Sequence, residues 1–332
     1  MHSILVGHAA LNVRAVQRQL ATLLPEARPA GIGESTLEVV GQGMDAPRLI
    51  SATVLEKGPL RAHRVFDPPV VAFQAFLDGT QRSEVASYLG GVPIVVGRAA
   101  AVVRERRNRR MHTWGVPLVE TRIYCPRAML DTAAWLTLQS TYGDALVDTS
   151  EGDVDLTSHP FALRDAAVHH VQSHREALEQ RLAERWCSRE RAPLFIDGGI
   201  SGSEAVAVSN CTVGVVKSHR TIYAEGAALA AVFALKHRER SSVFRITSPR
   251  RTTVASWYLR LRDPQGHDPM WGLVRVEIAQ PGAEAMQGIG ERADEISRWI
   301  LAEAAPLALP DARWDKMVYG IRDCEEFLRA IQ

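Results

Sequence analysis

The sequence has few of the features that mark secreted, membrane-spanning or zinc-binding proteins. Its four cysteines, Cys125, Cys187, Cys211 and Cys324, are isolated, with no CxxC pair and no histidines at zinc spacing, so we expect reduced thiols. No hydrophobic run approaches the ~20 residues of a membrane span. The first residues lack the cationic start and the cleavage site of a signal peptide. These absences predict a cytoplasmic protein that does not enter a membrane.

The chain also lacks an excess of charge of either sign. Its 332 residues contain 39 Lys and Arg against 38 Asp and Glu, so any binding of nucleic acid must depend on local basic patches. Lysine is scarce, and the cations are almost all arginine, whose planar guanidinium suits phosphate and carboxylate groups. A GC-rich genome would produce the same bias. The length allows two domains or one large domain, and no repeat of solenoid period is present.

Two apolar runs far apart in the chain end in the same way. Residues 70–80 are VVAFQAFLDGT and residues 193–199 are PLFIDGG, so each run ends in Asp-Gly, at Asp78 and at Asp197. This pattern is typical of a buried strand that ends at an acidic residue. One Asp-Gly is an ordinary solvated turn. Two of them at the ends of apolar strands predict carboxylates gathered at one edge of a sheet, as a divalent-metal site requires.

A cation and further carboxylates accompany these two strands. The apolar run Cys211–Val216 ends at Lys217, which comes near the carboxylates if the strands are neighbours. On a helix predicted at about 161–186, Glu179 lies beside the apolar stripe and Glu176 further round. An i,i+4 ion pair of Glu179 with Arg175 would explain its position equally well. Glu120, on a predicted strand GVPLVETRIYC that precedes this helix, is a further candidate.

A basic cluster follows another predicted strand. Five arginines stand within seven residues, at Arg104, Arg106, Arg107, Arg109 and Arg110. Such a cluster predicts contacts with a nucleic-acid backbone, and a solvated hairpin end is the alternative.

The order of elements predicts an α/β protein with helical ends. Helical periodicity indicates a helix over residues 1 to about 27, set apart from the sheet. Strand patterns then predict an antiparallel meander that begins at Asp78. We expect an N-terminal helical arm and connection at 1–66, a core at 67–280 with a helical insert at about 126–190, and a C-terminal helical segment at 281–332.

With these motifs the chain resembles the NurA nuclease family, which has an RNase H-like core and works with a HerA-type ATPase. FLDGT at 76–80 and FIDGG at 195–199 resemble the two Asp-Gly motifs of the family. RxxLE at 175–179 resembles its helical Glu motif, and VGVVKSHRTIY at 213–223 its next strand. The resemblance covers about residues 70–280. It departs at the C-terminus, where the family has a helix with a histidine and this chain has YGIRDCEEF.

The resemblance implies an α/β fold, with an RNase H-like mixed sheet flanked by helices and with N- and C-terminal helical extensions. It implies an endo/exodeoxyribonuclease of two-metal type, with Mn²⁺ or Mg²⁺ held by Asp78, Glu179 and Asp197. Lys217 would neutralise the scissile phosphate, and Tyr223 would orient a phosphate or a water. The implied partners are single- or double-stranded DNA, a HerA-like hexameric ATPase and a second copy in a homodimer. Such a system would act in DNA end processing, repair or anti-phage defence.

Two other classes of protein share parts of the pattern. A catalytically impaired RNase H-like subunit, which binds DNA or docks on an ATPase, agrees with the missing C-terminal histidine. A sugar- or phosphate-handling enzyme of ASKHA type also has Asp-Gly turns at strand ends. It would need a Gly-rich phosphate loop where this chain has VGVVKSHRT.

Overall fold

The chain divides into two units, each described here by itself. The structure is a computed structural model that describes residues 12–29, 36–37, 46–150, 159–265, 267–304, 316 and 318–331. The first unit comprises Met1–Met44, Gly79–Ala101 and Leu118–Leu178. The second comprises Asp45–Asp78, Val102–Pro117 and Glu179–Gln332. The division falls inside strands β6 (Ala75–Leu89), β7 (Val92–Arg107) and β8 (Arg110–Cys125) and inside helix α3 (Pro160–Arg189).

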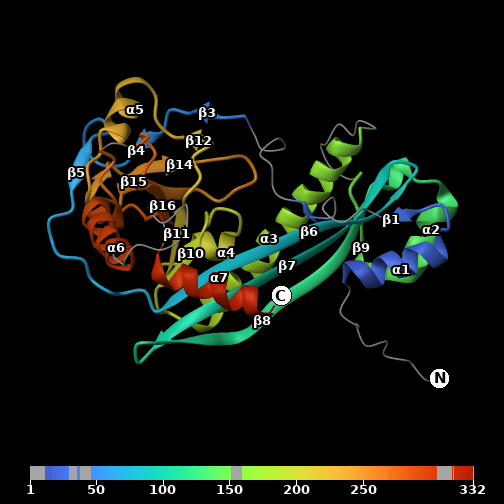
Figure 1. Cartoon of the computed structure of the whole chain (residues 1–332). Helices are drawn as coiled ribbons and strands as arrows, with labels where there is room; N and C mark the ends of the chain where they lie inside the picture. Colours follow the sequence, from blue (N-terminus) through green and yellow to red (C-terminus); the bar gives the residue numbers. More distant parts are fainter. Residues whose placement is uncertain are drawn as a thin grey trace. The chain divides into compact units, whose positions relative to one another are not determined.

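The second unit is built on a mixed β-sheet (Figure 1). From one edge toward β6 the strands are β4 (Thr53–Val54), β14 (Phe244–Ile246), β15 (Val254–Arg260), β16 (Leu273–Ala279), β11 (Thr212–Val216) and β10 (Leu194–Asp197). Pairs from β4 to β11 are antiparallel, whereas β11–β10 and β10–β6 are parallel. Parallel pairs therefore lie at the centre of a mixed sheet, which confirms the mixed α/β sheet predicted from the sequence.

Short strands extend the edges of this sheet. β5 (Ala62–Arg64) pairs with β13 (Glu239–Ser241), which pairs with β15. β12 (Thr221–Ile222) and β3 (Arg48–Leu49) pair in a separate two-stranded sheet. In the first unit, β1 (Arg28–Pro29) and β2 (Thr36–Leu37) pair with β6, and β9 (Leu146–Asp148) pairs with β8.

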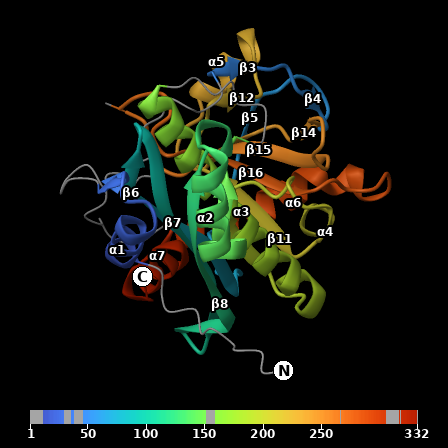
Figure 2. The same cartoon turned by 90° about the vertical axis from the view of Figure 1, so that its right-hand side faces the viewer.

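Helices flank the sheet of the second unit. α6 (Ile289–Glu303) lies alongside β15 and β16 (Figures 1 and 2), and the Ser297 hydroxyl accepts a 3.0 Å hydrogen bond from the Trp257 indole. α7 (Tyr319–Ile331), α4 (Glu204–Ala207) and α5 (Gly226–Phe233) complete this unit. Beneath α6 the ring of Phe73 meets those of Phe195 and Trp299 at 5.2 and 5.7 Å. The side of α6 that carries Ser297 and Trp299 therefore packs on the second unit around Trp257 and Phe73.

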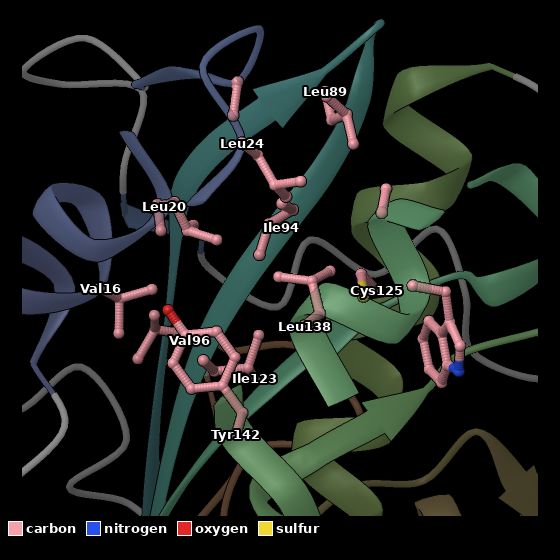
Figure 3. Close-up of a cluster of buried hydrophobic side chains, with 14 residues drawn as sticks. Val16, Leu20, Leu24, Leu89, Ile94, Val96, Ile123, Cys125, Leu138 and Tyr142 are labelled. Carbon is pink, nitrogen blue, oxygen red and sulfur yellow. The ribbon is translucent and has the colours of Figure 1, made fainter. Parts of the chain in front are cut away.

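The first unit has a core of its own, in which helices α1 (Val13–Leu23) and α2 (Thr132–Tyr142) pack on β6, β7 and β8 (Figure 3). Asn12 and Asp131 cap these helices by accepting hydrogen bonds from Ala15 and Ala134 backbone N–H groups. Val16 and Leu20 of α1 are fully buried. Among the described residues, α1 is thus part of this core, and the expectation of an arm set apart from the sheet was wrong.

The predicted turn at Asp78 is also absent. β6 continues through Asp78, Gly79 and Thr80 as far as Leu89, so Asp78 lies within a 15-residue strand. The antiparallel meander starts at Ala75 rather than at Asp78, and it turns at Gly90-Gly91 and at Asn108-Arg109. Asn108 and Arg109 both have positive φ, as a two-residue hairpin turn requires.

No helix in the described part of the chain is both long enough and apolar enough to cross a membrane.

Candidate active site

The strand register of the second unit places Asp78 next to Asp197. β6 and β10 run parallel with Leu77 opposite Ile196, so the following residues, Asp78 and Asp197, are neighbours. Adjacent strands lie about 4.8 Å apart, and residues at matching positions point to the same face. The two carboxylates that the sequence singled out therefore share one face of the sheet, at the point where β10 ends.

Lys217 reaches this face from the next strand. Asp197 lies opposite Val215 of β11, and Lys217 follows two residues later on the same side. Its ammonium nitrogen Nζ donates to Asp197 Oδ2 at 2.7 Å. The predicted cation is thus brought to the predicted carboxylates, and it forms an ion pair with one of them.

Asp78 lies in an environment that opposes its ionisation. It is only 6% exposed. Burial raises the pKa of Asp78 well above its usual range, and the negative charge of Asp197 raises it further. Lys217 lowers this pKa, while Glu179 and Glu325 raise it. Because carboxylates outnumber the one lysine, the surroundings of Asp78 disfavour its charged form.

The structure separates the three candidate glutamates. Glu179 is half-buried on α3, and its negative charge raises the pKa of Asp78. Glu176 is exposed and accepts a 2.9 Å hydrogen bond from Gln172, and Arg175 is 3.6 Å away. Glu120 belongs to the first unit, where it accepts hydrogen bonds from Arg122 at 2.9 Å and from the His174 ring at 2.8 Å. Of the three, Glu179 is the one that belongs to the same electrostatic cluster as Asp78.

A fourth carboxylate comes from α7, and sequence reasoning missed it. Glu325 of this helix is 8% exposed, and its negative charge raises the pKa of Asp78. α7 lies against β6, because the neighbouring Cys324 thiol donates to the Phe76 carbonyl at 3.4 Å. The signal in the sequence was the pattern of α7, in which Ile321, Cys324 and Leu328 are buried and bring Glu325 with them.

Gly320 sets how closely α7 approaches β6. A Cβ at this position would lie 2.3 Å from atoms of the Phe76 ring. We therefore expect Gly320→Ala to destabilise the protein by about 1–3 kcal/mol, the usual cost of overpacking. Thermal unfolding measures it, with Gly282→Ala as the control because no heavy atom lies within 4 Å of a Cβ there. An unchanged melting temperature in Gly320→Ala would contradict the packing of α7 on Phe76.

Tyr223 packs in a different group of side chains. Its ring stacks on Phe244 at 6.1 Å, and the Arg275 guanidinium lies 5.1 Å from its centroid. Its backbone N–H donates to the Tyr258 hydroxyl at 2.8 Å. Arg275 lies opposite Val216 of β11, one residue out of phase with Lys217, so it extends from the other face of the sheet. The structure does not bring Tyr223 together with Asp78, Asp197 and Lys217.

The five clustered arginines have two different environments. Arg104 donates to Asp323 at 2.5 Å and to Thr113 at 2.7 Å, and Arg106 donates to both carboxylate oxygens of Glu303, at 2.8 and 2.7 Å. These two arginines hold α7 and α6 against the strands. Arg107, Arg109 and Arg110 are exposed around the β7–β8 turn, and Arg107 pairs with Glu105. The surface open to a ligand is therefore the tip of this hairpin.

The site has the chemistry of a hard-cation site without a preformed coordination shell. In the described part of the chain, no group of three or more His, Cys, Asp or Glu side chains is arranged to hold a metal ion. Carboxylate oxygens are nevertheless the donors that Mg²⁺ and Mn²⁺ prefer. The excess of carboxylates around buried Asp78 fits a divalent cation, and Asp197 would have to exchange its contact with Lys217 for one with the ion.

These observations define a mixed α/β protein with a buried acidic site on its central parallel strands. No family model and no curated protein matches the sequence. Among solved structures, the chain is similar to the NurA nuclease from Sulfolobus solfataricus, with 11% sequence identity and a TM-score of 0.46 over 81% of this chain and 82% of that one. A likeness of this degree supports no inference about activity, so the proposal below depends on the residues of the site.

Proposed function

We propose that this protein is a metal-dependent DNA nuclease that hydrolyses phosphodiesters at the Asp78–Asp197 site. The observation that carries the proposal is the register of β6 and β10, which sets the two carboxylates side by side on one face. The charges of Glu179 and Glu325, which both act on Asp78, support it. A site with this many carboxylates and one lysine suits a reaction in which cations and a phosphate meet.

Asp78, Asp197 and Glu179 would hold Mn²⁺ or Mg²⁺, and Glu325 adds negative charge from α7. Bound there, the ions would stabilise the attacking and leaving oxygens of the phosphodiester. A bound cation would favour the charged form of Asp78, which its burial and the neighbouring carboxylates disfavour. Lys217, freed from Asp197, would place its ammonium against the scissile phosphate as a point charge. Tyr223 would act on a phosphate or a water only if the loop after β11 moved, because its ring packs on Phe244.

The exposed arginines of the β7–β8 hairpin are the proposed DNA contacts. Replacing both Arg109 and Arg110 with Ala is expected to weaken DNA binding and to reduce the salt slope of log K by about two, since each phosphate contact contributes about 0.9. The double variant Arg185→Ala with Arg189→Ala removes the same charge from exposed positions on α3 and is the matched control. Fluorescence anisotropy over a salt series measures both. Equal slopes in the two variants would rule out the hairpin as the contact.

The proposed partners are a HerA-like hexameric ATPase and a second copy of this chain. The family resemblance in the sequence motifs supports both. A chain of balanced charge has only local basic surfaces, such as this hairpin tip, with which to hold duplex DNA, so it would bind the duplex weakly alone. Co-purification with a HerA-like ATPase, and mass measurement of the free and bound protein, test this assembly.

The activity itself is tested by degradation of end-labelled single- and double-stranded DNA in Mn²⁺, Mg²⁺ or EDTA. Cleavage that requires a divalent ion and disappears in Asp197→Ala supports the proposal. A folded wild-type protein that binds DNA without cleaving it would instead support a second candidate, a catalytically impaired RNase H-like subunit that binds DNA or docks on an ATPase. The ion pair of Lys217 with Asp197 favours this second candidate, because it neutralises a carboxylate that a metal site needs.

A further inference from the structure

The backbone turn that follows Asp197 leaves the face of the sheet on which the carboxylates lie. Asp197 is opposite Val215 of β11, on the face that also carries Asp78. The next residue, Gly198, has a φ of +144°, and its N–H donates to the Val215 carbonyl at 3.1 Å. Glycine adopts such a φ readily, whereas other residues are strained there. The direction of the chain therefore changes immediately after the proposed metal ligand.

The turn then packs on Gly214 of β11, on the opposite face of the sheet. Gly214 precedes Val215, so its side-chain position is on the face away from Asp197. A Cβ at Gly214 would lie 2.7 Å from the Gly198 carbonyl oxygen and 3.0 Å from the Ile200 side chain. The absence of a side chain at Gly214 thus allows the turn to lie directly on the strand.

Glu277 fixes the turn from the neighbouring strand. It is opposite Gly214 on β16, and it is only 3% exposed. Its Oε2 accepts a 2.9 Å hydrogen bond from the Ile200 N–H, while its Oε1 accepts from the Arg275 guanidinium. Hydrogen bonds to a charged acceptor are stronger than those between neutral groups. Because Ile200 is three residues after Asp197, this carboxylate restrains the backbone close to the proposed ligand.

Glu277 supports the site without belonging to the ligand set. Both of its oxygens are engaged by donors, and it extends from the face opposite to Asp197. Its partner Arg275 is itself held, since the guanidinium lies 5.1 Å from the centroid of the Tyr223 ring. The contacts therefore form a chain from Tyr223 through Arg275 and Glu277 to the turn at residues 198–200.

We propose that Glu277 is a positioning residue for the divalent-cation site, which holds the Asp197 carboxylate in place through the backbone turn at residues 198–200. This inference rests on the proposed function, since it concerns the same site. Groups that support a metal ligand typically change metal affinity or activity by about 10–100-fold when they are replaced. Because Glu277 acts through the backbone, we expect the lower end of this range.

Glu277→Gln tests the inference with little change in shape. An amide has a single acceptor oxygen, so it cannot accept from the Ile200 N–H and from Arg275 as the two carboxylate oxygens do. We expect calorimetry without DNA to show a loss of about tenfold in Mn²⁺ affinity. In the metal-free protein, amide hydrogen exchange at residues 198–200 should become faster. The double variant Arg275→Met with Glu277→Gln leaves the amide oxygen to Ile200, so it should recover most of both losses.

Glu303→Gln is the matched control. Glu303 is also buried, at 4% exposed, and it is also paired with an arginine, Arg106. The change removes the same charge from the same unit at a place with no hydrogen bond to the turn. It should lower the melting temperature, but it should leave the Mn²⁺ affinity of the folded protein and the exchange at residues 198–200 unchanged.

Gly214→Ala perturbs the same turn from β11, so the test does not depend on Glu277→Gln alone. The added Cβ displaces the Gly198 carbonyl, and Mn²⁺ affinity should fall here as well. Equal Mn²⁺ affinity in wild type, Glu277→Gln and Gly214→Ala would overturn the inference and leave the metal site intact. An equal loss of affinity in Glu303→Gln would also overturn it. A wild-type protein that binds no Mn²⁺ would instead contradict the proposed function, and this inference with it.

Discussion

Asp78→Asn is expected to abolish Mn²⁺-dependent DNA cleavage and, in the absence of divalent ions, to make the protein more stable. The loss of activity should exceed about a hundredfold, since replacing even a residue that only hydrogen-bonds to a metal ligand typically costs about 10–100-fold in metal affinity or activity. The gain in stability follows from the environment of Asp78, where burial and neighbouring carboxylates raise its pKa. Asparagine keeps the shape and does not ionise, so it removes this cost.

The sign of the stability change depends on pH. A raised pKa in the folded protein means that the fold favours the protonated carboxyl at low pH, and this contribution is lost as the pH rises through that pKa. The stabilisation of Asp78→Asn relative to wild type should therefore grow from acidic toward neutral and higher pH. Each kcal/mol should raise the melting temperature by about 2–4 °C, because the domain is large.

Asp144→Asn is the matched control for this experiment, because Asp144 is exposed in the first unit. It should change neither the melting temperature nor the cleavage rate. If Asp78→Asn cleaves DNA normally, Asp78 is not a metal ligand. If it is less stable than wild type at neutral pH without metal, the environment assigned to Asp78 is wrong.

Glu179→Gln should reduce cleavage about as strongly as Asp78→Asn, while Glu176→Gln should stay within about threefold of wild type. Both changes remove one negative charge from the same helix, so they have nearly equal effects on net charge and helix propensity. They differ in position: the charge of Glu179 raises the pKa of Asp78, whereas Glu176 is exposed and hydrogen-bonded to Gln172. Steady-state cleavage rates at saturating Mn²⁺ separate the two.

Glu120→Gln completes this series. Glu120 accepts hydrogen bonds from Arg122 and His174, so the change should lower the melting temperature of the protein more than it lowers the cleavage rate per folded molecule. If Glu120→Gln is inactive with a normal melting temperature and Glu179→Gln remains active, then Glu120 rather than Glu179 is the third carboxylate of the site.

The placement of Asp197 and Lys217 could be predicted from the sequence because it depends on short stretches of sequence around each residue. β10 and β11 are short and mainly apolar, and β10 ends at Asp197 while Lys217 follows β11, so their carboxyl ends can be predicted from composition. Parallel pairing then brings both ends to one face. The helical stripe of α3 also predicted that Glu179 lies nearer to the core than Glu176, and Glu179 is half-buried whereas Glu176 is exposed.

The features that sequence reasoning missed depend on long-range packing. Asp78-Gly79 has the composition of a turn, yet β6 runs through it. α1 carries an amphipathic pattern that fits an arm as well as a packed helix, and only the partners on β6, β7 and α2 decide between them. Arg104 and Arg106 looked available to DNA because their acceptors, Asp323 and Glu303, are about two hundred residues away in sequence.

The central claim, that Asp78 and Asp197 share a divalent-cation site, is tested most directly by Mn²⁺ binding without DNA. Electron paramagnetic resonance or calorimetry of the wild type should show saturable binding of one or two ions, and the affinity should rise with pH as Asp78 loses its proton. Asp78→Asn and Asp197→Asn should each lose the tightest site and its pH dependence, whereas Asp144→Asn should keep both. Equal Mn²⁺ affinity in wild type, Asp78→Asn and Asp197→Asn would contradict the claim.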